Sequence, residues 1–492
     1  MFEKISPEAA GIPSDAVRRF LEHCERHGNT MHSILMMRGD CIFSENYWAP
    51  FDRDFCHRMY SQTKSFVSVA IGLLIEDGRL SLDDRLASYF PEEIDGTLPP
   101  FLAEQTIRET LTMTTAGISE SWFTSTEHDR TRIYFNRTNT VRPAGTLFEY
   151  DSPGSQVLCH LVEKLTGKPL LAFLKERLFD KMGTFRTAYT LKTPTGVTWG
   201  DSAMLCTTRD IASFGRLVMQ YGVYDGERLM GEAYLREATS RLVDNDSDFG
   251  GSNVFKYGYG YQIWRAERGF AFVGMGNQMT VCIPELDFLF TCTADDQGNL
   301  SARHLLIHSL FEEIVDLLGD PLPEDPSALA RLEAYSSSLK LRAFDVGATT
   351  SRTAERINGR TFFCEENRMG IRSFSLSFAG DSGVFRYTNR TGEKEIPFGL
   401  GYNVFGAFPE PGYSDDVGTV PKAGHFYRDA VSGGWCDETR FVLRVQIIDK
   451  YFGNMTAYFA FKGDTVTLRM TKTAEAFLNE YVGDLVARAE KE

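Results

Sequence analysis

The segment from Tyr60 to Gly78 constrains the fold most, because it predicts a helix that is buried on nearly all sides. Its residues from Ser65 to Ile75 are almost all apolar or small, and Asp77-Gly78 is a helix-stop signal. An apolar run without a one-sided stripe is typical of a helix buried on most of its surface. Ser61 then lies in the first turn, and Lys64 lies one turn further on the same side.

Lys64 occupies a costly position in such a helix. The start of a helix carries the positive end of its dipole, and apolar surroundings remove the hydration of a charged amine. Both effects favour the neutral amine, and a neutral amine beside a hydroxyl is a base beside a nucleophile. Free backbone N–H groups at the helix start can also bind a developing oxyanion. The alternative makes Ser61 an N-cap and lets Lys64 extend to water.

The length and charge of the chain exclude several classes of function. A chain of 492 residues is too long for one hydrophobic core, so we expect two or three domains. The net charge of −15 disfavours nucleic acid and anionic membranes as partners. No segment has the roughly 20 apolar residues of a membrane span, and the N-terminus lacks the pattern of a signal peptide. We therefore expect a cytoplasmic protein.

The cysteine and histidine patterns predict neither disulfides nor a metal. The nine cysteines are odd in number, include no C-x-x-C pair and in several cases lie in apolar runs, as reduced core residues do. His304 and His308 have the spacing of metal ligands on a helix. No H-E-x-x-H glutamate lies between them, so we expect no metal and no cofactor.

The order of elements over residues 1–325 predicts an α+β domain. A helix–hairpin–helix order near the N-terminus favours an antiparallel sheet flanked by helices. Helices are expected at 13–27 (with Ser14 as its cap), 61–76, 106–112, 155–165, 211–221 and 302–318. Strands are expected in a hairpin at 32–38 and 41–47 and in a meander at 259–264, 270–273, 279–283 and 288–293. Residues 118–145, which contain Trp122 and Tyr134, are expected to form a surface segment that could wall a cleft.

The C-terminal part of the chain has a different pattern. After three prolines between 321 and 326, residues 326–356 are expected to form a linker with one helix. From 357 to 492 apolar and polar residues alternate in one segment after another, which predicts an antiparallel β-sandwich or barrel. A terminal helix is expected at 473–489. The sequence leaves open whether this domain is a substrate lid, an oligomer surface or a binding module.

Three elements supply the groups that acyl transfer needs. Ser61 and Lys64 provide a nucleophile and a base, and Tyr150 stands on a turn before a helix, where it can project into a pocket. Gly274 and Gly276 form a turn that lets the backbone approach another group closely. Together they are a nucleophile, a proton shuttle and oxyanion donors. Considered alone, Tyr150 is also typical of a tyrosine that packs in a core, and the two glycines are also typical of an ordinary turn.

The chain resembles the serine β-lactamase and penicillin-binding protein-like hydrolases, in particular the esterases and amidases related to class C β-lactamases. S-x-x-K is a motif of that superfamily. The resemblance covers roughly residues 5–320 and is carried by four segments: Tyr60–Phe66, Ile75–Asp84, Thr207–Ala212 and Ile283–Asp287. It implies the β-lactamase/transpeptidase-like fold, in which a helical subdomain accompanies the antiparallel sheet.

The resemblance also implies roles for individual residues. Ser61 would be the acylated nucleophile, and Lys64 would accept its proton or hold a tyrosine anionic. Tyr150 would pass a proton to the leaving group, and Ser152 fills the asparagine position of the family's Tyr-x-Asn element. The backbone N–H groups of Ser61 and Met275 would form the oxyanion hole.

The sequence departs from the family where substrate is bound. Phe272-Val273-Gly274 stands where the family has Lys-x-Gly or His-x-Gly, whose cation attracts a substrate carboxylate. Phe272 cannot attract one, and Ser152 lacks the amide that contacts a substrate carbonyl. We therefore expect substrate contacts from Ser152, Phe272 and Gly274, and an uncharged ester or amide as substrate.

These observations favour a serine hydrolase, a carboxylesterase or amidase that cleaves a small ester or amide through an acyl-enzyme on Ser61. One alternative is an amidase or peptidase that acts on short peptides, on D-amino-acid-containing peptides or on β-lactams. An alternative of another class is a catalytically silent binding scaffold. The expected partner is a small molecule, with no nucleic acid and no membrane, and a homo-oligomer stays open.

Overall fold

The computed structural model describes residues 2–117, 123, 125–137, 139–245, 255–299, 301–344, 347–414, 416–474 and 477–490. It divides into two compact units, residues 1–340 with 415–418 and residues 341–414 with 419–492. Among the described residues no helix combines the length and the apolar character needed to cross a membrane. Trp122 of the expected surface segment lies outside the described residues.

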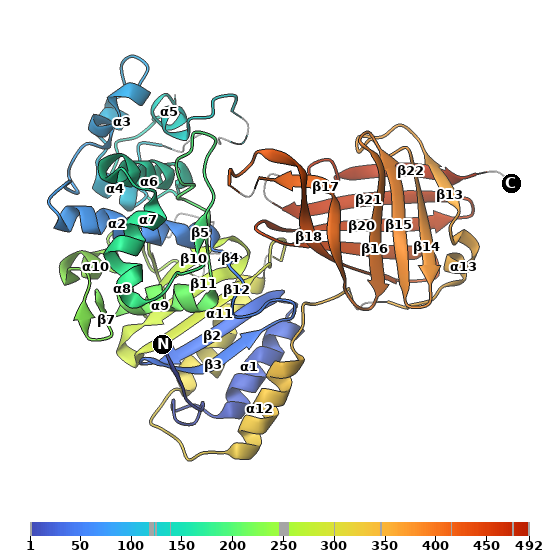
Figure 1. Cartoon of the computed structure of the whole chain (residues 1–492), viewed down its shortest axis with the longest axis horizontal. Helices are drawn as coiled ribbons and strands as arrows, with labels where there is room; N and C mark the ends of the chain where they lie inside the picture. The colour runs from blue at the N-terminus through green and yellow to red at the C-terminus, as the bar shows by residue number, and fades with distance from the viewer. Residues whose placement is uncertain are drawn as a thin grey trace. The chain divides into compact units, whose positions relative to one another are not determined.

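A seven-stranded sheet forms the centre of the first unit (Figure 1). Its strand order is β1-β3-β2-β12-β11-β10-β9, and only β1 and β3 run parallel. The expected hairpin and meander therefore join in one sheet, since β2 pairs with β12. The strands are β1 (Glu3–Lys4), β2 (Met31–Arg38), β3 (Cys41–Tyr47), β9 (Trp264–Arg265), β10 (Phe270–Gly274), β11 (Gln278–Ile283) and β12 (Phe288–Ala294).

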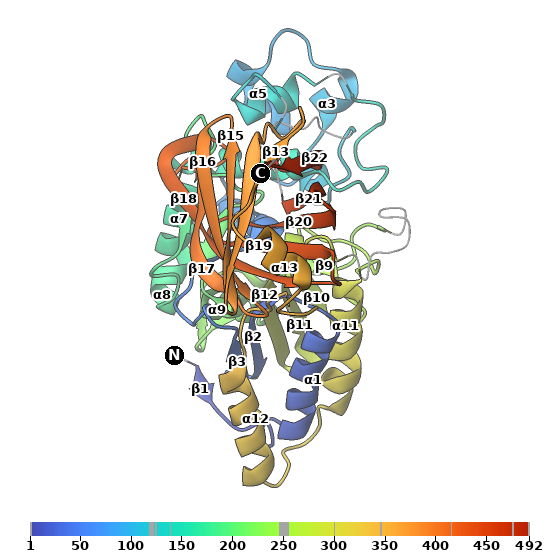
Figure 2. The same ribbon diagram turned by 90° about the vertical axis from the view of Figure 1, so that its right-hand side faces the viewer.

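Helices cover both faces of this sheet, and alternate residues of its strands pack against the helices on one face or the other. Ile34 and Met36 of β2 join one hydrophobic cluster with helices α1 (Ser14–Arg26), α11 (Ala302–Glu313) and α12 (Pro326–Ser338). Leu35 and Met37 join a second cluster with α2 (Thr63–Glu76) and α9 (Thr208–Met219) on the opposite face. The α1 and α12 helices lie side by side in both views (Figure 1 and Figure 2). These layers confirm the predicted α+β fold.

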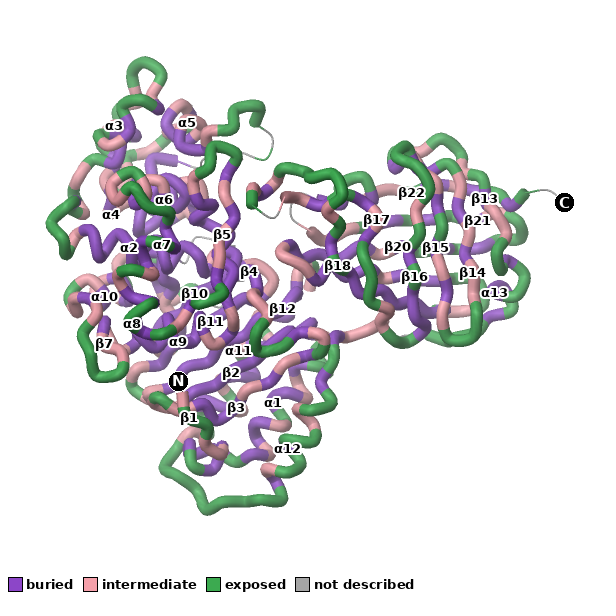
Figure 3. Tube along the Cα trace, in the orientation of Figure 1, coloured by how far each residue is buried: buried purple, intermediate pink, exposed green. Residues whose placement is uncertain are grey.

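The α2 helix is buried as the sequence predicts. Every residue from Thr63 to Leu74 is buried, and Figure 3 shows the helix in the buried colour over most of its length. It packs against α6 (Ser152–Thr166) and α7 (Leu170–Leu174), and α9 joins the same core and contacts strands β2, β11 and β12. The further helices and short strands of this unit are α3 (Pro100–Glu104), α4 (Ile107–Leu111), α5 (Arg130–Phe135), α8 (Asp180–Met182), α10 (Glu232–Ala238), β4 (His57–Arg58), β5 (Tyr189–Thr190), β6 (Met204–Cys206), β7 (Val223–Tyr224) and β8 (Glu227–Arg228).

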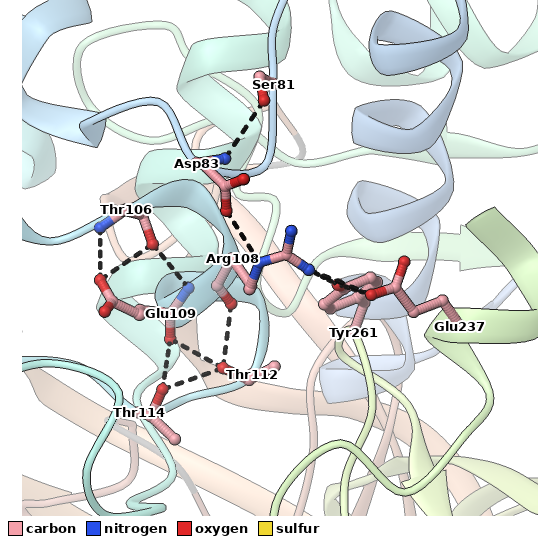
Figure 4. Close-up of polar contacts among 9 residues, drawn as sticks. All are labelled: Ser81, Asp83, Thr106, Arg108, Glu109, Thr112, Thr114, Glu237 and Tyr261. Carbon is pink, nitrogen blue, oxygen red and sulfur yellow. Dashed lines mark hydrogen bonds and ion pairs between the residues drawn. The ribbon is translucent and has the colours of Figure 1, made fainter.

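The α4 helix shows how local sequence fixes the helical part. Thr106 and Glu109 form a reciprocal capping box at its start (Figure 4). Arg108 then donates hydrogen bonds to Asp83, to Glu237 and to the Tyr261 hydroxyl. These contacts connect three segments: the loop after α2, helix α4 and helix α10.

The second unit is a closed barrel. Its ten strands follow the order β16-β15-β14-β13-β22-β21-β20-β19-β18-β17, and a pairing of β16 with β18 closes nine of them. The closing pair is parallel because an odd number of alternating strands cannot close with all pairs antiparallel. The strands are β13 (Thr361–Cys364), β14 (Ser373–Ala379), β15 (Ser382–Asn389), β16 (Gly392–Leu400), β17 (Val404–Tyr413), β18 (Pro421–Trp435), β19 (Arg440–Ile448), β20 (Phe452–Lys462), β21 (Thr465–Ala474) and β22 (Gly483–Ala489), and α13 (Arg352–Ile357) precedes them.

Four local expectations were wrong. The segment 473–489, where a terminal helix was expected, contains the end of β21 and strand β22, and residues 475–476 lie outside the described part. In β22 Leu485, Ala487 and Ala489 are buried, whereas Asp484 and Arg488 are exposed. Its alanines, leucine and arginine favour a helix, but pairing with β21 and β13 overrides that propensity. Of the strand expected at 259–264, only Trp264 belongs to β9.

The remaining two corrections concern a helix cap and a surface segment. Pro13, not Ser14, is the N-cap of α1, since the Ser14 side chain donates to Glu8 instead. Tyr134 of the expected surface segment is 1% exposed, because it lies in α5 within the helical core. Helix α12 lies within the first unit, which extends to residue 340.

Candidate active site

Ser61 lies in a strained turn that leads into α2. Residues Tyr60–Gln62 form a 3₁₀ turn, and Tyr60 has a φ of +46°. A positive φ is unfavourable for a bulky residue and persists only where the surroundings fix it. Here the Tyr60 side chain is fully buried, and the Arg58 guanidinium lies 4.4 Å from its ring centroid. The fold thus holds the Ser61 backbone in a defined position.

The Lys64 amine is buried in direct contact with the Ser61 hydroxyl. Its Nζ donates to Ser61 Oγ at 2.9 Å and to the backbone carbonyl of Asp201 at 2.7 Å. The Asp201 carboxylate lies 4.0 Å from the same amine, and the Lys64 side chain is 1% exposed. The alternative in which Lys64 extends to water is therefore wrong.

Tyr150 completes the group at the end of the loop before α6. Its ring centroid lies 5.1 Å from Lys64 Nζ, and the ring stacks on Trp264 with centroids 5.5 Å apart. Tyr150 is half-buried, so the stacking partner fixes its ring without removing it from the surface. Ser152, two residues later, is the first residue of α6 and is also half-buried.

The end of strand β10 lies against the backbone that carries Ser61. A Cβ atom on Gly274 would come within 2.4 Å of the Met59 carbonyl oxygen and 3.3 Å of the Ser61 nitrogen. Only glycine allows this approach. It brings the peptide between Gly274 and Met275 next to the Ser61 backbone, where two N–H donors are expected.

Phe272 is not brought into this group. Its ring is fully buried, with centroids 5.3 Å from Phe214 on α9 and 5.9 Å from Phe270. Alternation along β10 explains the difference, because Phe270 and Phe272 face the α9 layer while Ala271 and Val273 face the other cluster. Phe272 therefore fills the core and leaves no charge at the family's cation position.

Three residues near the site had no signal in the sequence: Asp201, Trp264 and Arg303. Asp201 acts through a backbone carbonyl, which every residue has. Arg303 on α11 donates from Nη2 to the Gly274 carbonyl at 3.1 Å and from Nε to Asn277 Oδ1 at 3.0 Å. Burial lowers the pKa of the Arg303 guanidinium below its usual value, and nearby Tyr150 and Asp296 offset only part of this lowering.

The described residues include no cluster of three or more His, Cys, Asp or Glu side chains that could hold a metal ion. The described side chains place a buried amine beside a hydroxyl, with a phenol ring next to the amine.

The family model that matches this chain lies within the first unit. The Beta-lactamase family model matches residues 22–309. Over 250 residues the chain is 27% identical to the 6-aminohexanoate-dimer hydrolase of Paenarthrobacter ureafaciens, which covers 47% of this chain. The match spans 63% of that relative's length, less than two thirds of it.

Solved structures show the same fold. A candidate 6-aminohexanoate-dimer hydrolase from Bacillus anthracis has a TM-score of 0.52 at 18% identity, over 65% of this chain and 87% of its own. A penicillin-binding protein homologue from Caulobacter crescentus has a TM-score of 0.50 at 16% identity, over 62% of this chain and 99% of its own. At these identities the likeness concerns the fold alone.

Proposed function

Because this chain belongs to the beta-lactamase family of hydrolases, we propose that it cleaves a small ester or amide through an acyl-enzyme on Ser61. The observation that carries this proposal is the buried contact of 2.9 Å between Lys64 Nζ and Ser61 Oγ. Proton transfer needs heavy atoms at hydrogen-bond distance, and this pair meets that requirement before substrate binds.

In the proposed acylation step, Ser61 Oγ attacks the substrate carbonyl carbon and its proton passes to Lys64 Nζ. The step requires the neutral amine, which donates to the Asp201 carbonyl and keeps one lone pair for the proton of Ser61. The ammonium that forms then lies 4.0 Å from the Asp201 carboxylate, which stabilises the new charge. The backbone N–H groups of Ser61 and Met275 receive the oxyanion.

In the second half of the step, the tetrahedral intermediate expels the alcohol or amine, which takes a proton from Tyr150. Tyr150 then regains a proton from the Lys64 ammonium through one water, since Nζ lies 5.1 Å from the centroid of the Tyr150 ring. Water then attacks the acyl-enzyme with the same groups acting in reverse, releases the acid and restores Ser61. No cofactor enters this scheme.

The side chains of β10 favour a substrate without a carboxylate. Phe272 lies in the core, so the strand offers no cation for a substrate carboxylate, which favours an uncharged ester or amide. A linear amide is the second candidate, favoured by the 27% identity to a relative named as a 6-aminohexanoate-dimer hydrolase. The unpaired state of all nine cysteines, each a described residue, supports the proposal of a reducing, cytoplasmic location.

Labelling with a fluorophosphonate probe, followed by peptide mass spectrometry, tests the proposed function. We expect modification of Ser61 in the native protein and none in Ser61→Ala. Rates on p-nitrophenyl acetate, a linear amide, D-alanyl amides and a chromogenic cephalosporin then rank the substrate classes. An unlabelled Ser61, with equal hydrolysis by Ser61→Ala, would favour the silent scaffold, and a dominant cephalosporin rate would contradict the uncharged substrate.

A further inference from the structure

The peptide between Gly274 and Met275 has two polar ends with different partners. In a trans peptide the carbonyl and the N–H point in opposite directions. The group that fixes the Gly274 carbonyl therefore also fixes the direction of the Met275 N–H. That group is Arg303, whose Nη2 donates to the Gly274 carbonyl oxygen at 3.1 Å.

Arg303 is itself held by a buried chain of polar contacts. Its Nε donates to Asn277 Oδ1 at 3.0 Å, and Asn277 Nδ2 donates to Asp296 Oδ2 at 2.8 Å. Asp296 in turn accepts from Asn29 Nδ2 at 2.8 Å and from the Thr30 N–H at 2.6 Å. Asn29 and Thr30 directly precede β2 in the central sheet. The direction of the guanidinium is thus set by the sheet and not by solvent.

We propose that Arg303 is a positioning residue, which aims and polarises the Met275 N–H as an oxyanion donor by binding the opposite end of the same peptide. This inference rests on the proposed function. A cationic donor on a carbonyl draws electron density from the amide nitrogen, so the N–H becomes a stronger donor. The gain appears where charge develops on the substrate oxygen, so it lowers the barrier to acylation more than it tightens substrate binding.

The turn has a second anchor, which makes the role of Arg303 separable from folding. Gln278 Nε2 donates to the Met275 carbonyl at 2.8 Å and to the Ala294 carbonyl at 2.7 Å. Its Oε1 accepts from the Ala294 N–H at 3.0 Å. Gln278 keeps the turn against β12 when Arg303 is changed, so we expect Arg303 variants to fold and to lose alignment at Met275 only.

The experiment measures single-turnover acylation by p-nitrophenyl acetate, which is uncharged, and by a matched anionic ester. Arg303→Ala is expected to lower the acylation rate constant about 10- to 100-fold for both esters, with KM changed less than about threefold, because misaiming one donor costs less than deleting it. Arg303→Lys keeps the charge but has a single donor nitrogen, so its acylation rate constant is expected to lie between those of Arg303→Ala and the wild type. His304→Ala, an exposed neighbour on α11, serves as the control and is expected to match the wild type.

A spectroscopic measurement reports the oxyanion site directly. The carbonyl stretch of the trapped acyl-enzyme, followed by isotope-edited infrared spectroscopy, is expected at higher frequency in Arg303→Ala than in the wild type, since the carbonyl accepts a weaker hydrogen bond. Thermal melts confirm that each variant is folded. A loss confined to KM for the anionic ester would show carboxylate binding instead and would overturn the inference.

The same data distinguish this inference from the proposed function. Ser61 labelled normally, with a wild-type acylation rate and carbonyl frequency in Arg303→Ala, would overturn the role of Arg303 alone. Absence of any acyl-enzyme in the wild type would overturn the proposed function and this inference together.

Discussion

Gly274→Ala adds one methyl group where strand β10 lies against the segment that carries Ser61. The φ of Gly274 is −125°, which any residue adopts, so the change acts through steric contact and not through backbone strain. The new Cβ would lie 2.4 Å from the Met59 carbonyl oxygen, whereas ordinary contact begins near 3.4 Å. The two backbones must therefore separate by about 1 Å to accept it.

That displacement sets the size of the expected effect. An oxyanion donor acts at about 2.7–3.1 Å, so a shift of about 1 Å takes the Met275 N–H out of range. Losing one such donor costs about 100- to 1,000-fold in kcat, and forcing an extra methyl group into a packed site costs about 1–3 kcal/mol of stability. We expect both losses in Gly274→Ala.

Stopped-flow acylation and thermal unfolding measure the two effects. Gly319→Ala in the same unit is the matched control, because its Cβ would meet no atom within 4 Å and its φ is not positive. We expect the control to acylate at the wild-type rate. A Gly274→Ala protein that is folded and acylates at the wild-type rate would refute the placement of an oxyanion donor at Met275.

Three further predictions concern proton transfer and stability. Lys64→Met keeps a side chain of similar length but has no base, so acylation should fall about 100- to 10,000-fold in a folded protein, as measured by stopped flow; a fall below tenfold would contradict Lys64 as the proton acceptor. Tyr150→Phe keeps the stack on Trp264, so hydrolysis of an amide should fall much more than that of a p-nitrophenyl ester, whose leaving group needs no proton; equal losses would contradict the role of Tyr150. Burial raises the pKa of the Asp429 carboxyl in the barrel to about 7, so the folded state binds a proton that the unfolded state releases above pH 4. Barrel stability should therefore fall as pH rises from about 4 to about 7, by at most roughly 4 kcal/mol, and Asp429→Asn should raise the melting temperature more at pH 8 than at pH 5; an equal gain at both pH values would exclude this titration.

The contact between Ser61 and Lys64 was predictable because helix geometry alone brings residues three apart together. The buried nature of α2 followed from its almost uninterrupted apolar run, and the hairpin followed from the turn signal Gly39-Asp40 between two strand-like segments. The strong local patterns at these places agree with the tertiary structure, so local sequence was sufficient.

The rest depended on contacts between distant segments. The partner of the Lys64 amine is a backbone carbonyl 137 residues away, and no residue type marks such an acceptor. Arg303 donates a hydrogen bond to another backbone carbonyl, that of Gly274, so no residue type in the sequence marks its place in the site. Phe272 lies in the core because alternate residues of β10 face opposite sides of the sheet. A one-residue change in register would turn its side chain to the other face.

The barrel shows the same limit on a larger scale. The alternation of apolar and polar residues predicted its strands. The choice between a sandwich and a barrel depended on a parallel pairing between β16 and β18, which no local sequence pattern predicts. Strand β22 was predicted as a helix because its residues prefer one in isolation. Its two neighbours in the barrel supply the pairing that decides otherwise.

The central claim is that a buried amine activates the hydroxyl of Ser61. Its most direct test is rapid-quench mass spectrometry of the native protein during hydrolysis of p-nitrophenyl acetate. We predict an acetyl group on the peptide that holds Ser61, formed within the burst, absent from Ser61→Ala and strongly delayed in Lys64→Met. Turnover with no adduct on Ser61, or an equal burst in Lys64→Met, would contradict it.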